Sequence, residues 1–325
     1  MLLRSIVAVF LPTAILFTGG VAAALQEDPA KELLGAWEAV ATAAADKPSI
    51  KFLEFQAAKV AIYAVYQGQG QLAFASVAYK PGKILASMAG TKVPFGVELK
   101  GGELTLKALS GPIAQAMPDP MVFRKVAKTP PELEVKLLEL GKPENLMKAH
   151  PDAKSLEKAV NDIGKELDRR LEMDQAVRRD PKRQAEMPKV DADNTAYLLG
   201  LVKDYGWIDV QHFGAPASNA AFLLVQHSGN LPLMAAVLPL IREDVLAKRL
   251  DGQPYALLYD RLKLFTGEKQ RYGTQIGTNE KGEMVVNALE NRSKVDEFRK
   301  ELGLPPLSTY LEHFKSQGKI AFEDD

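Results

Sequence analysis

The stretch Val97-Glu98-Leu99-Lys100-Gly101-Gly102-Glu103-Leu104-Thr105-Leu106 decides the fold of the first half of the chain. On both sides of the two glycines, apolar and polar residues alternate, which is the period of a half-buried β-strand. Adjacent glycines supply the positive φ angles that a two-residue hairpin turn requires. We therefore predict two antiparallel strands joined at Gly101-Gly102.

Short β-prone runs surround this hairpin between residues 31 and 128. Turn residues separate them, for example Gln67-Gly68-Gln69-Gly70 and Pro81-Gly82. Seven or eight short strands at this spacing are typical of an antiparallel barrel or sandwich. The predicted strands are Lys51–Phe55, Val60–Tyr66, Gln71–Tyr79, Lys83–Met88, Phe95–Leu99, Glu103–Leu106 and Met121–Val126.

The pattern changes to helical spacing after Thr129-Pro130-Pro131. We predict a helical connector over residues 129–171, in which Ser155 caps a helix whose apolar stripe ends at Leu171. A mainly helical domain follows over residues 172–325, with helices expected at 194–205 (capped by Asp193), 217–227, 231–247 and 255–265. The predicted fold class is α+β, a small antiparallel β-barrel followed by a mainly α-helical domain.

Composition narrows the class of protein. The 325 residues are 46% apolar and 25% charged, an ordinary globular mixture. Lys plus Arg and Asp plus Glu both number 41, so the formal net charge is zero, which argues against a strongly basic nucleic-acid binder and an acidic disordered chain. The chain has no cysteine and only 4 scattered histidines, so we expect no disulfide, no metal site and no cofactor.

The N-terminus has the pattern of a secretory signal peptide. Arg4 gives a positive start, Ser5–Phe17 is mostly apolar, and Val21-Ala22-Ala23-Ala24 supplies the small residues of a cleavage site. We predict cleavage after Ala24 and export to the periplasm or the medium. The alternative is an uncleaved membrane anchor, although Pro12 and the short apolar run favour cleavage. We expect no membrane contact after cleavage.

Two short motifs link residues 31–128 to a known kind of domain. Gly35-x-Trp37 at the start and Phe123-Arg124-Lys125-Val126 at the end resemble the small lipocalin-like domains of exported bacterial proteins. The resemblance implies that Trp37 closes one end of the barrel. The other end either holds a small apolar ligand or is filled by the barrel's own side chains, and the sequence leaves both possibilities open.

A longer set of motifs marks the second half. It comprises Asp174-Gln175, Asn194, Tyr205-Gly206-Trp207, Gln226-His227, Asp260-Arg261, Gln270-Arg271-Tyr272-Gly273-Thr274-Gln275 and Gly303-Leu304-x-Pro306-Leu307. This combination resembles the bacterial domain of unknown function 6624. One departure is Ser228-Gly229-Asn230 after the histidine, where many relatives carry a small residue and Asp. The resemblance implies no particular activity.

The motif residues suggest a polar site. His227 is the candidate general acid or base, because its ordinary pKa lies near neutral pH, and Asp260 is the candidate carboxylate that orients it. Arg178 or Arg261 can bind an anion through two hydrogen bonds. The candidate ligand-binding residues are Asp174, Gln175, Arg178, Asn194, Gln226, Arg261, Gln270, Tyr272 and Gln275.

A structural role is the alternative for each of these groups. His227 can be a hydrogen-bonded residue at a helix end, and Asp260-Arg261 can form an ion pair with Asp174 or Arg178. Gly273 can provide a tight turn whose flanking Gln and Thr side chains bond buried backbone groups. Asp191-Ala192-Asp193-Asn194-Thr195 superficially matches a phosphotransferase motif, but the polar segment before it is not the buried strand that such a nucleophile needs.

Two hypotheses of function follow. The first is an exported binding or interaction protein whose partner is a small molecule or an envelope protein. The second is a hydrolase-like enzyme with His227 as general base and Asp260 as its orienting carboxylate. The enzyme hypothesis requires these two side chains to share an open cleft, whereas a structural role requires both to be buried and hydrogen-bonded.

Overall fold

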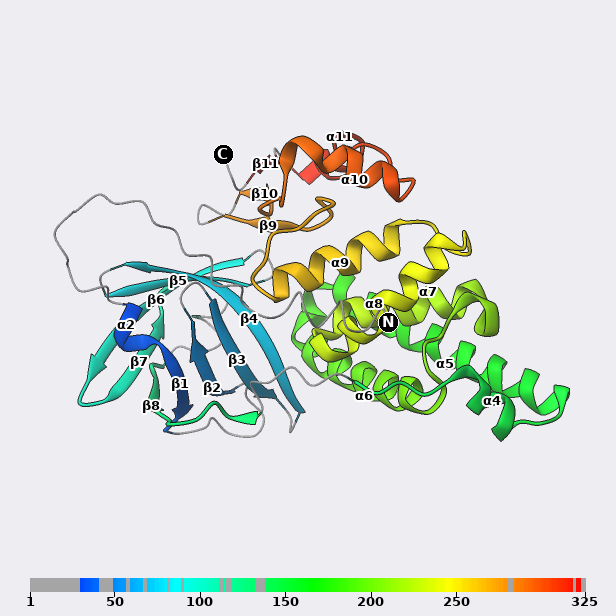
Figure 1. Cartoon of the computed structure of the whole chain (residues 1–325), viewed down its shortest axis with the longest axis horizontal. Coiled ribbons are helices and arrows are strands. Elements are labelled where there is room, and N and C mark those ends of the chain that lie inside the picture. The colour runs from blue at the N-terminus through cyan, green and yellow to red at the C-terminus, as the bar shows by residue number, and fades with distance from the viewer. Residues whose placement is uncertain are drawn as a thin grey trace, which may run out of the picture.

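The computed structural model describes residues 30–40, 49–56, 59–66, 69–80, 82–88, 91–110, 114, 119–131, 138–279, 283–317 and 320–322. The predicted signal peptide, residues 1–24, lies outside this set. Figure 1 shows a β-barrel beside a group of helices. The predicted fold class, a small antiparallel barrel followed by a mainly helical domain, is confirmed.

The first half is a closed eight-stranded barrel. Each strand pairs antiparallel with the next, and the last pairs with the first. At the hairpin quoted above, Lys100 pairs with Glu103, and Gly101 and Gly102 have φ angles of 60° and 81°. The strands are β1 (Gly35–Ala39), β2 (Ser49–Phe55), β3 (Lys59–Tyr66), β4 (Gln69–Lys80), β5 (Lys83–Met88), β6 (Thr91–Lys100), β7 (Glu103–Ala108) and β8 (Met121–Lys125).

The described side chains fill the barrel. Trp37 is 1% exposed, and its indole Nε1 donates to the carbonyl oxygen of Leu33 in the short helix α2 (Ala30–Leu33) at 2.8 Å. Leu104 and Phe123 are fully buried beside it. A remaining apolar cavity of about 40 Å³ is far smaller than the roughly 300–1,000 Å³ of an ordinary ligand pocket. Of the two possibilities left open by the sequence, the described residues show the filled barrel.

Five longer helices build the second half. They are α5 (Ala153–Arg179), α6 (Met187–Tyr205), α7 (Val210–Ser228), α8 (Leu231–Leu246) and α9 (Gln253–Phe265). Short elements complete this half: α4 (Pro143–Ala149), β9 (Ile276–Thr278), β10 (Met284–Val286), α10 (Val295–Glu301), α11 (Leu307–Leu311) and β11 (Ala321–Phe322). The apolar faces of α5 to α9 form one core, in which Trp207 is 3% exposed, as expected for a structural tryptophan.

Several helix ends differ from the predictions. Asp152, not Ser155, caps α5, because its carboxylate accepts from the backbone N–H of Ser155 at 2.9 Å. Helix α6 begins at Met187 and not after Asp193, because a proline in the first helical turn lacks only an N–H that would have no intrahelical partner. Helix α7 begins at Val210 but is kinked at Gly214 (φ 79°), so its second part starts near the predicted Pro216.

The two halves touch along β4. Figure 1 shows this strand on the side of the barrel that faces α8 and α9. Phe74 of β4 packs against the core of the helical half. Gly267, which follows α9 with a φ of 69°, approaches the same strand so closely that a Cβ there would lie 3.2 Å from the backbone N of Ser76. Backbone pairing of Thr91 with Thr278 also connects β6 to β9.

Candidate functional site

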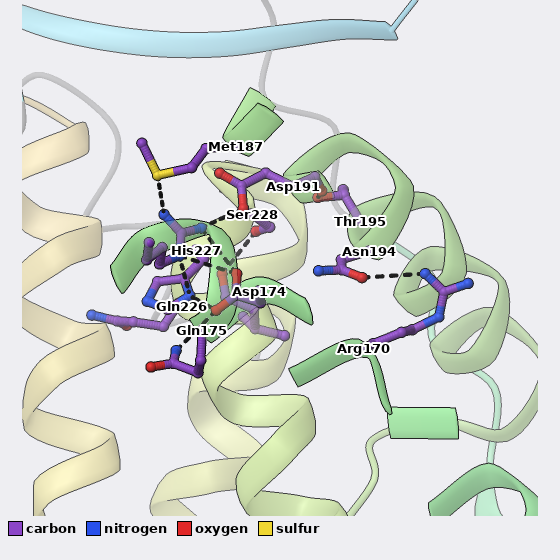
Figure 2. Close-up of polar contacts among 12 residues, drawn as sticks. Arg170, Asp174, Gln175, Met187, Asp191, Asn194, Thr195, Gln226, His227 and Ser228 are labelled. Carbon is purple, nitrogen blue, oxygen red and sulfur yellow. Dashed lines mark hydrogen bonds and ion pairs between the residues drawn. The ribbon is translucent and has the colours of Figure 1, made fainter. Parts of the chain in front are cut away.

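Three helix ends bring a group of polar side chains together. Asp174, Gln175 and Arg178 come from the last turns of α5, Asp191 from the second turn of α6, and His227 from the last turn of α7. We call these five residues the helix-end cluster. Figure 2 shows Asp174, Gln175, Asp191 and His227 converging on one another.

Asp174 fixes the imidazole of His227. Its Oδ2 lies 2.9 Å from His227 Nδ1, and its side chain is fully buried, whereas 19% of the His227 side chain is exposed. Gln175 Nε2 donates to the same Oδ2 at 2.9 Å, and Arg178 Nε donates to Oδ1 at 3.1 Å. Arg178 Nε also lies 3.1 Å from His227 Nδ1.

Two neighbours of His227 Nδ1 favour opposite tautomers. The carboxylate of Asp174 only accepts, which favours a proton on Nδ1, whereas Arg178 Nε only donates, which favours a lone pair there. In the tautomer with the proton on Nδ1, that N–H donates to Asp174 Oδ2, and the N–H of Arg178 Nε donates to Asp174 Oδ1. The other nitrogen, Nε2, has no hydrogen-bond partner among the described residues and is not one of their fully buried polar atoms. In this tautomer Nε2 carries the lone pair, as a general base requires.

One guanidinium serves two carboxylates within the cluster. Arg178 bridges the carboxylates of Asp174 (3.0 Å) and Asp191. Burial acts to raise the pKa of Asp174, but the hydrogen bonds and charges of His227 and Arg178 outweigh it, so this pKa is lowered. For Asp191 burial prevails over the charge of Arg178, and its pKa is raised.

Arg261 of α9 adds a further cation near Arg178. Its Nη1 donates to the backbone carbonyl of Gln226 at 2.6 Å, and its Nε donates to Gln275 Oε1 at 3.2 Å. Both acceptors are neutral. Burial and, to a smaller extent, the positive charge of Arg178 lower the pKa of Arg261 to about 10, although Tyr310 and Asp191 act to raise it, so the guanidinium stays protonated at neutral pH.

The predicted pairing of Asp260 with His227 is wrong. Asp260 is fully buried, and its two oxygens accept from the backbone N–H groups of Arg271, Tyr272 and Thr274 and from Thr274 Oγ1, at 2.8 to 3.2 Å. Burial raises its pKa, which these donors oppose. With these bonds the carboxylate organises a loop, and it has no bond to His227. The predicted ion pair with Arg178 or Asp174 is also wrong among the described residues.

The loop between α9 and β9 is held by side chains, as the structural alternative predicted. Gly273 has a φ of 69°. Gln270 is fully buried, and its amide donates to the carbonyls of Gln275 and Asn287, while its oxygen accepts from the N–H of Gln275. Gln270 thus supports the loop. Gln275 Nε2 donates to the carbonyl of Leu257, so Gln275 links the loop to α9 as well as to Arg261.

Three other predicted ligand-binding residues have partners outside the helix-end cluster. Asn194 Oδ1 accepts from Arg170 Nη1 at 3.2 Å, and Figure 2 shows this pair apart from the helix-end cluster. Tyr272 is 5% exposed, and its ring meets that of Tyr259 edge-on at 5.4 Å. Gln226 is 4% exposed, with its amide donating to the carbonyl of Leu257 at 3.3 Å. These side chains act in packing.

Sequence reasoning missed Asp191 as a member of the site. It was weighed only as part of a phosphotransferase-like motif and set aside. The available signal was the i,i+4 spacing of Asp174 and Arg178 on one helix, which places a carboxylate and a guanidinium side by side. That spacing did not reveal that Arg178 would reach a second carboxylate from the next helix.

Neither a candidate metal site nor a candidate membrane span occurs among the described residues. They contain no group of three or more His, Asp or Glu side chains placed to hold a metal ion. Within the same residues, no helix combines the length and apolar character that crossing a bilayer requires.

Comparison with known proteins places the helix-end cluster in a family region. Residues 162–319 match the model of a family of unknown function, DUF6624, so the resemblance noted for the second half is confirmed. The matched region starts within α5 and contains every residue of the cluster together with Arg261. Neither the curated proteins nor the solved structures contain a match to this chain.

Proposed function

We propose that the helical half of the chain, which carries the match to this family of unknown function, is a hydrolase-like enzyme with His227 as its general base. One observation carries the proposal. A fully buried carboxylate, Asp174, lies 2.9 Å from His227 Nδ1, while the imidazole remains 19% exposed. Asp174 takes the orienting role that the sequence had suggested for Asp260.

The two nitrogens of the imidazole have different roles in the proposed reaction. Asp174 holds Nδ1 and stabilises the imidazolium that forms when Nε2 takes a proton. Nε2 would remove a proton from a water molecule as its oxygen adds to an electrophilic centre of the substrate. The same nitrogen would then return the proton to the leaving group. Because Gln175 and Arg178 also bond Asp174, the carboxylate stays ionised and fixed throughout.

The second candidate is a binding module without catalysis. It is favoured by the double pairing of Arg178 with Asp174 and Asp191, which holds the cluster in one arrangement before any ligand arrives. In that case His227 Nε2 contributes a hydrogen bond to a small molecule or to a side chain of an envelope protein. The two candidates share a site and differ only in whether the bound molecule is converted.

Chromogenic esters, amides and phosphate esters test the proposal with the full mature chain. We expect His227→Gln to lose at least about 100-fold in kcat/KM, the usual contribution of a general base. His212→Gln is the matched control. His212 Nδ1 lies 2.8 Å from Asp209 Oδ2, but this pair belongs to the exposed start of α7. The control should keep full activity.

Two results overturn the enzyme proposal. One is equal activity of His227→Gln and wild type, and the other is no turnover of any substrate class. Saturable binding of a substrate that is never converted, weakened by His227→Gln, would instead favour the binding module.

We further propose that the protein is exported, on the evidence of the signal-like segment Met1–Ala24. The mass of the protein purified from the cell envelope or the medium tests this. We expect a mature chain that begins at Leu25. An intact N-terminus in the cytosol would contradict export.

A further inference from the structure

We propose that Arg261 binds an anionic group of the substrate, a carboxylate or a phosphate, beside His227. This inference rests on the proposed function of the helix-end cluster and names the class of molecule that the site accepts.

Among the described residues, Arg261 forms no direct ion pair, although Asp191 acts on it through space. Its two bonded nitrogens donate to a side-chain amide oxygen (Gln275) and to a backbone carbonyl (Gln226), which are both neutral. The third nitrogen, Nη2, has no partner among the described residues and is not one of their fully buried polar atoms. A guanidinium has five N–H donors in a planar fork, so a free edge remains for a ligand.

The other arginines near the site are occupied. Arg170 pairs with Asp193, Arg178 with Asp174 and Asp191, and Arg271 with Glu290. Arg299 also lacks a carboxylate partner, but it is fully buried and donates to the carbonyls of Tyr272 and Pro305. Arg261 alone among these combines a missing anion with partial exposure.

The charge of Arg261 predicts which class of ligand the site prefers. Arg261 is mostly buried and near Arg178, an arrangement that disfavours its charged form and lowers its pKa. Desolvated charges are costly unless they are paired. The nearby Arg178 is paired with two carboxylates, and one of them, Asp191, acts through space to stabilise the charged form of Arg261. No carboxylate of the described residues bonds the Arg261 guanidinium directly, so its exposed edge is open to an anionic ligand, whereas a cationic ligand would be repelled.

Position connects this cation to the proposed chemistry. Arg261 Nη1 bonds the carbonyl of Gln226, the residue immediately before His227 on α7. The guanidinium is thereby fixed to the backbone of α7 next to His227. Two parallel N–H···O bonds would orient such a group as well as attract it.

The test uses inorganic phosphate, acetate and neutral acetamide as probes of the full mature chain, followed by ¹H–¹⁵N NMR of the His227 ring. We expect phosphate or acetate to shift the His227 resonances saturably, and acetamide to leave them unchanged. Whichever anion binds more tightly identifies the ligand class.

Arg261→Gln should weaken this binding at least about tenfold, the effect expected from losing a charge-assisted hydrogen bond. Arg271→Gln, which removes an arginine already paired with Glu290, is the matched control.

Arg261→Lys covers the case in which Arg261→Gln does not fold. It keeps the positive charge but loses the planar fork, so binding should be weakened yet measurable. The inference is overturned if Arg261→Gln or Arg261→Lys binds the anions as tightly as wild type, or if neither anion binds. Its failure is distinguishable from failure of the proposed enzyme. Turnover of neutral substrates that is unchanged in Arg261→Gln would support the proposed enzyme and reject the anion site. Anion binding that depends on Arg261 but occurs without any turnover would support the anion site and reject the enzyme.

Discussion

At the scale of single residues, the helix-end cluster sets two carboxylates against one guanidinium. Arg178 contacts both, but the surroundings of the carboxylates differ. Asp174 receives additional bonds from His227 and Gln175, and its pKa is lowered, whereas burial dominates at Asp191 and raises its pKa. The surroundings thus favour the ionised form of Asp174 and the protonated form of Asp191.

This difference predicts opposite pH trends for two conservative variants. A lowered pKa means that the charge of Asp174 stabilises the fold fully above its ordinary pKa of 3.8, and that this stability is lost as pH falls through the folded-state value. A raised pKa means that the Asp191 contribution is present below 3.8 and is lost as pH rises through its folded-state value. Asp174→Asn should therefore cost about 3 kcal/mol at neutral pH.

Urea unfolding followed by far-UV circular dichroism measures both trends. At neutral pH and above, the deficit of Asp174→Asn should stay constant, because the pH there lies above both pKa values of Asp174. As the pH rises above 3.8, wild type loses the stability that Asp191 contributes, so Asp191→Asn should become more stable relative to wild type. Parallel pH trends for the two variants would show that Asp191 is ionised like Asp174.

At the scale of elements, the loop between α9 and β9 is built around a carboxylate and a glycine. Asp260 gathers the N–H groups of the loop, and Gly273 turns it with a φ of 69°. A Cβ at Gly273 would lie 2.8 Å and 3.0 Å from the two methyl carbons of Leu307. The loop therefore requires glycine for two reasons, backbone conformation and the closeness of α11.

Two glycine substitutions test this requirement. Gly273→Ala should destabilise the protein by about 1–3 kcal/mol, since it combines an unfavourable φ with overpacking. Gly200→Ala is the control, because Gly200 is exposed within α6 and a Cβ there would meet nothing within 4 Å. It should stabilise by about 0.5–1 kcal/mol through helix propensity. Equal effects of the two changes in thermal unfolding would contradict the proposed strain at Gly273.

At the scale of the whole molecule, strand β4 is the part of the barrel that contacts the helices. Phe74 of β4 packs against the helical core, while Phe52, another member of the aromatic group on that side of the barrel, contacts Tyr63 and not the helices. Each half also holds one tryptophan, Trp37 in the barrel and Trp207 among the helices. Their fluorescence reports on the two halves separately.

Phe74→Ala should shift the unfolding transition of the helical half. We expect a loss of about 2 kcal/mol in the transition reported by Trp207 in a Trp37→Phe background, because a buried aromatic contact is replaced by a gap. Phe52→Ala should lower the transition reported by Trp37 in a Trp207→Phe background and leave the Trp207 transition in place. If Phe74→Ala moves only the Trp37 transition, β4 does not couple the two halves.

Most elements, and the family resemblance of the second half, follow from local patterns in the sequence. Alternating residues around Gly101-Gly102 predicted a hairpin, and the spacing of similar runs predicted the barrel, because strand period and turn chemistry are local properties. Helix ends were less certain, since Pro188 reads as a break but also fits a first helical turn. The second-half motifs identified a family region.

Tertiary structure alone decided which carboxylate serves His227. Asp174 lies 53 residues from His227 in the chain, and no local pattern distinguishes it from Asp260. Both acids belong to the same motif set, and each is fully buried. Only the packing of α5 against α7 brings Asp174 next to Nδ1 of His227, whereas Asp260 is hydrogen-bonded to the loop after α9. Side-chain partners across helices depend on packing angles, which are properties of the assembled core and not of any one segment.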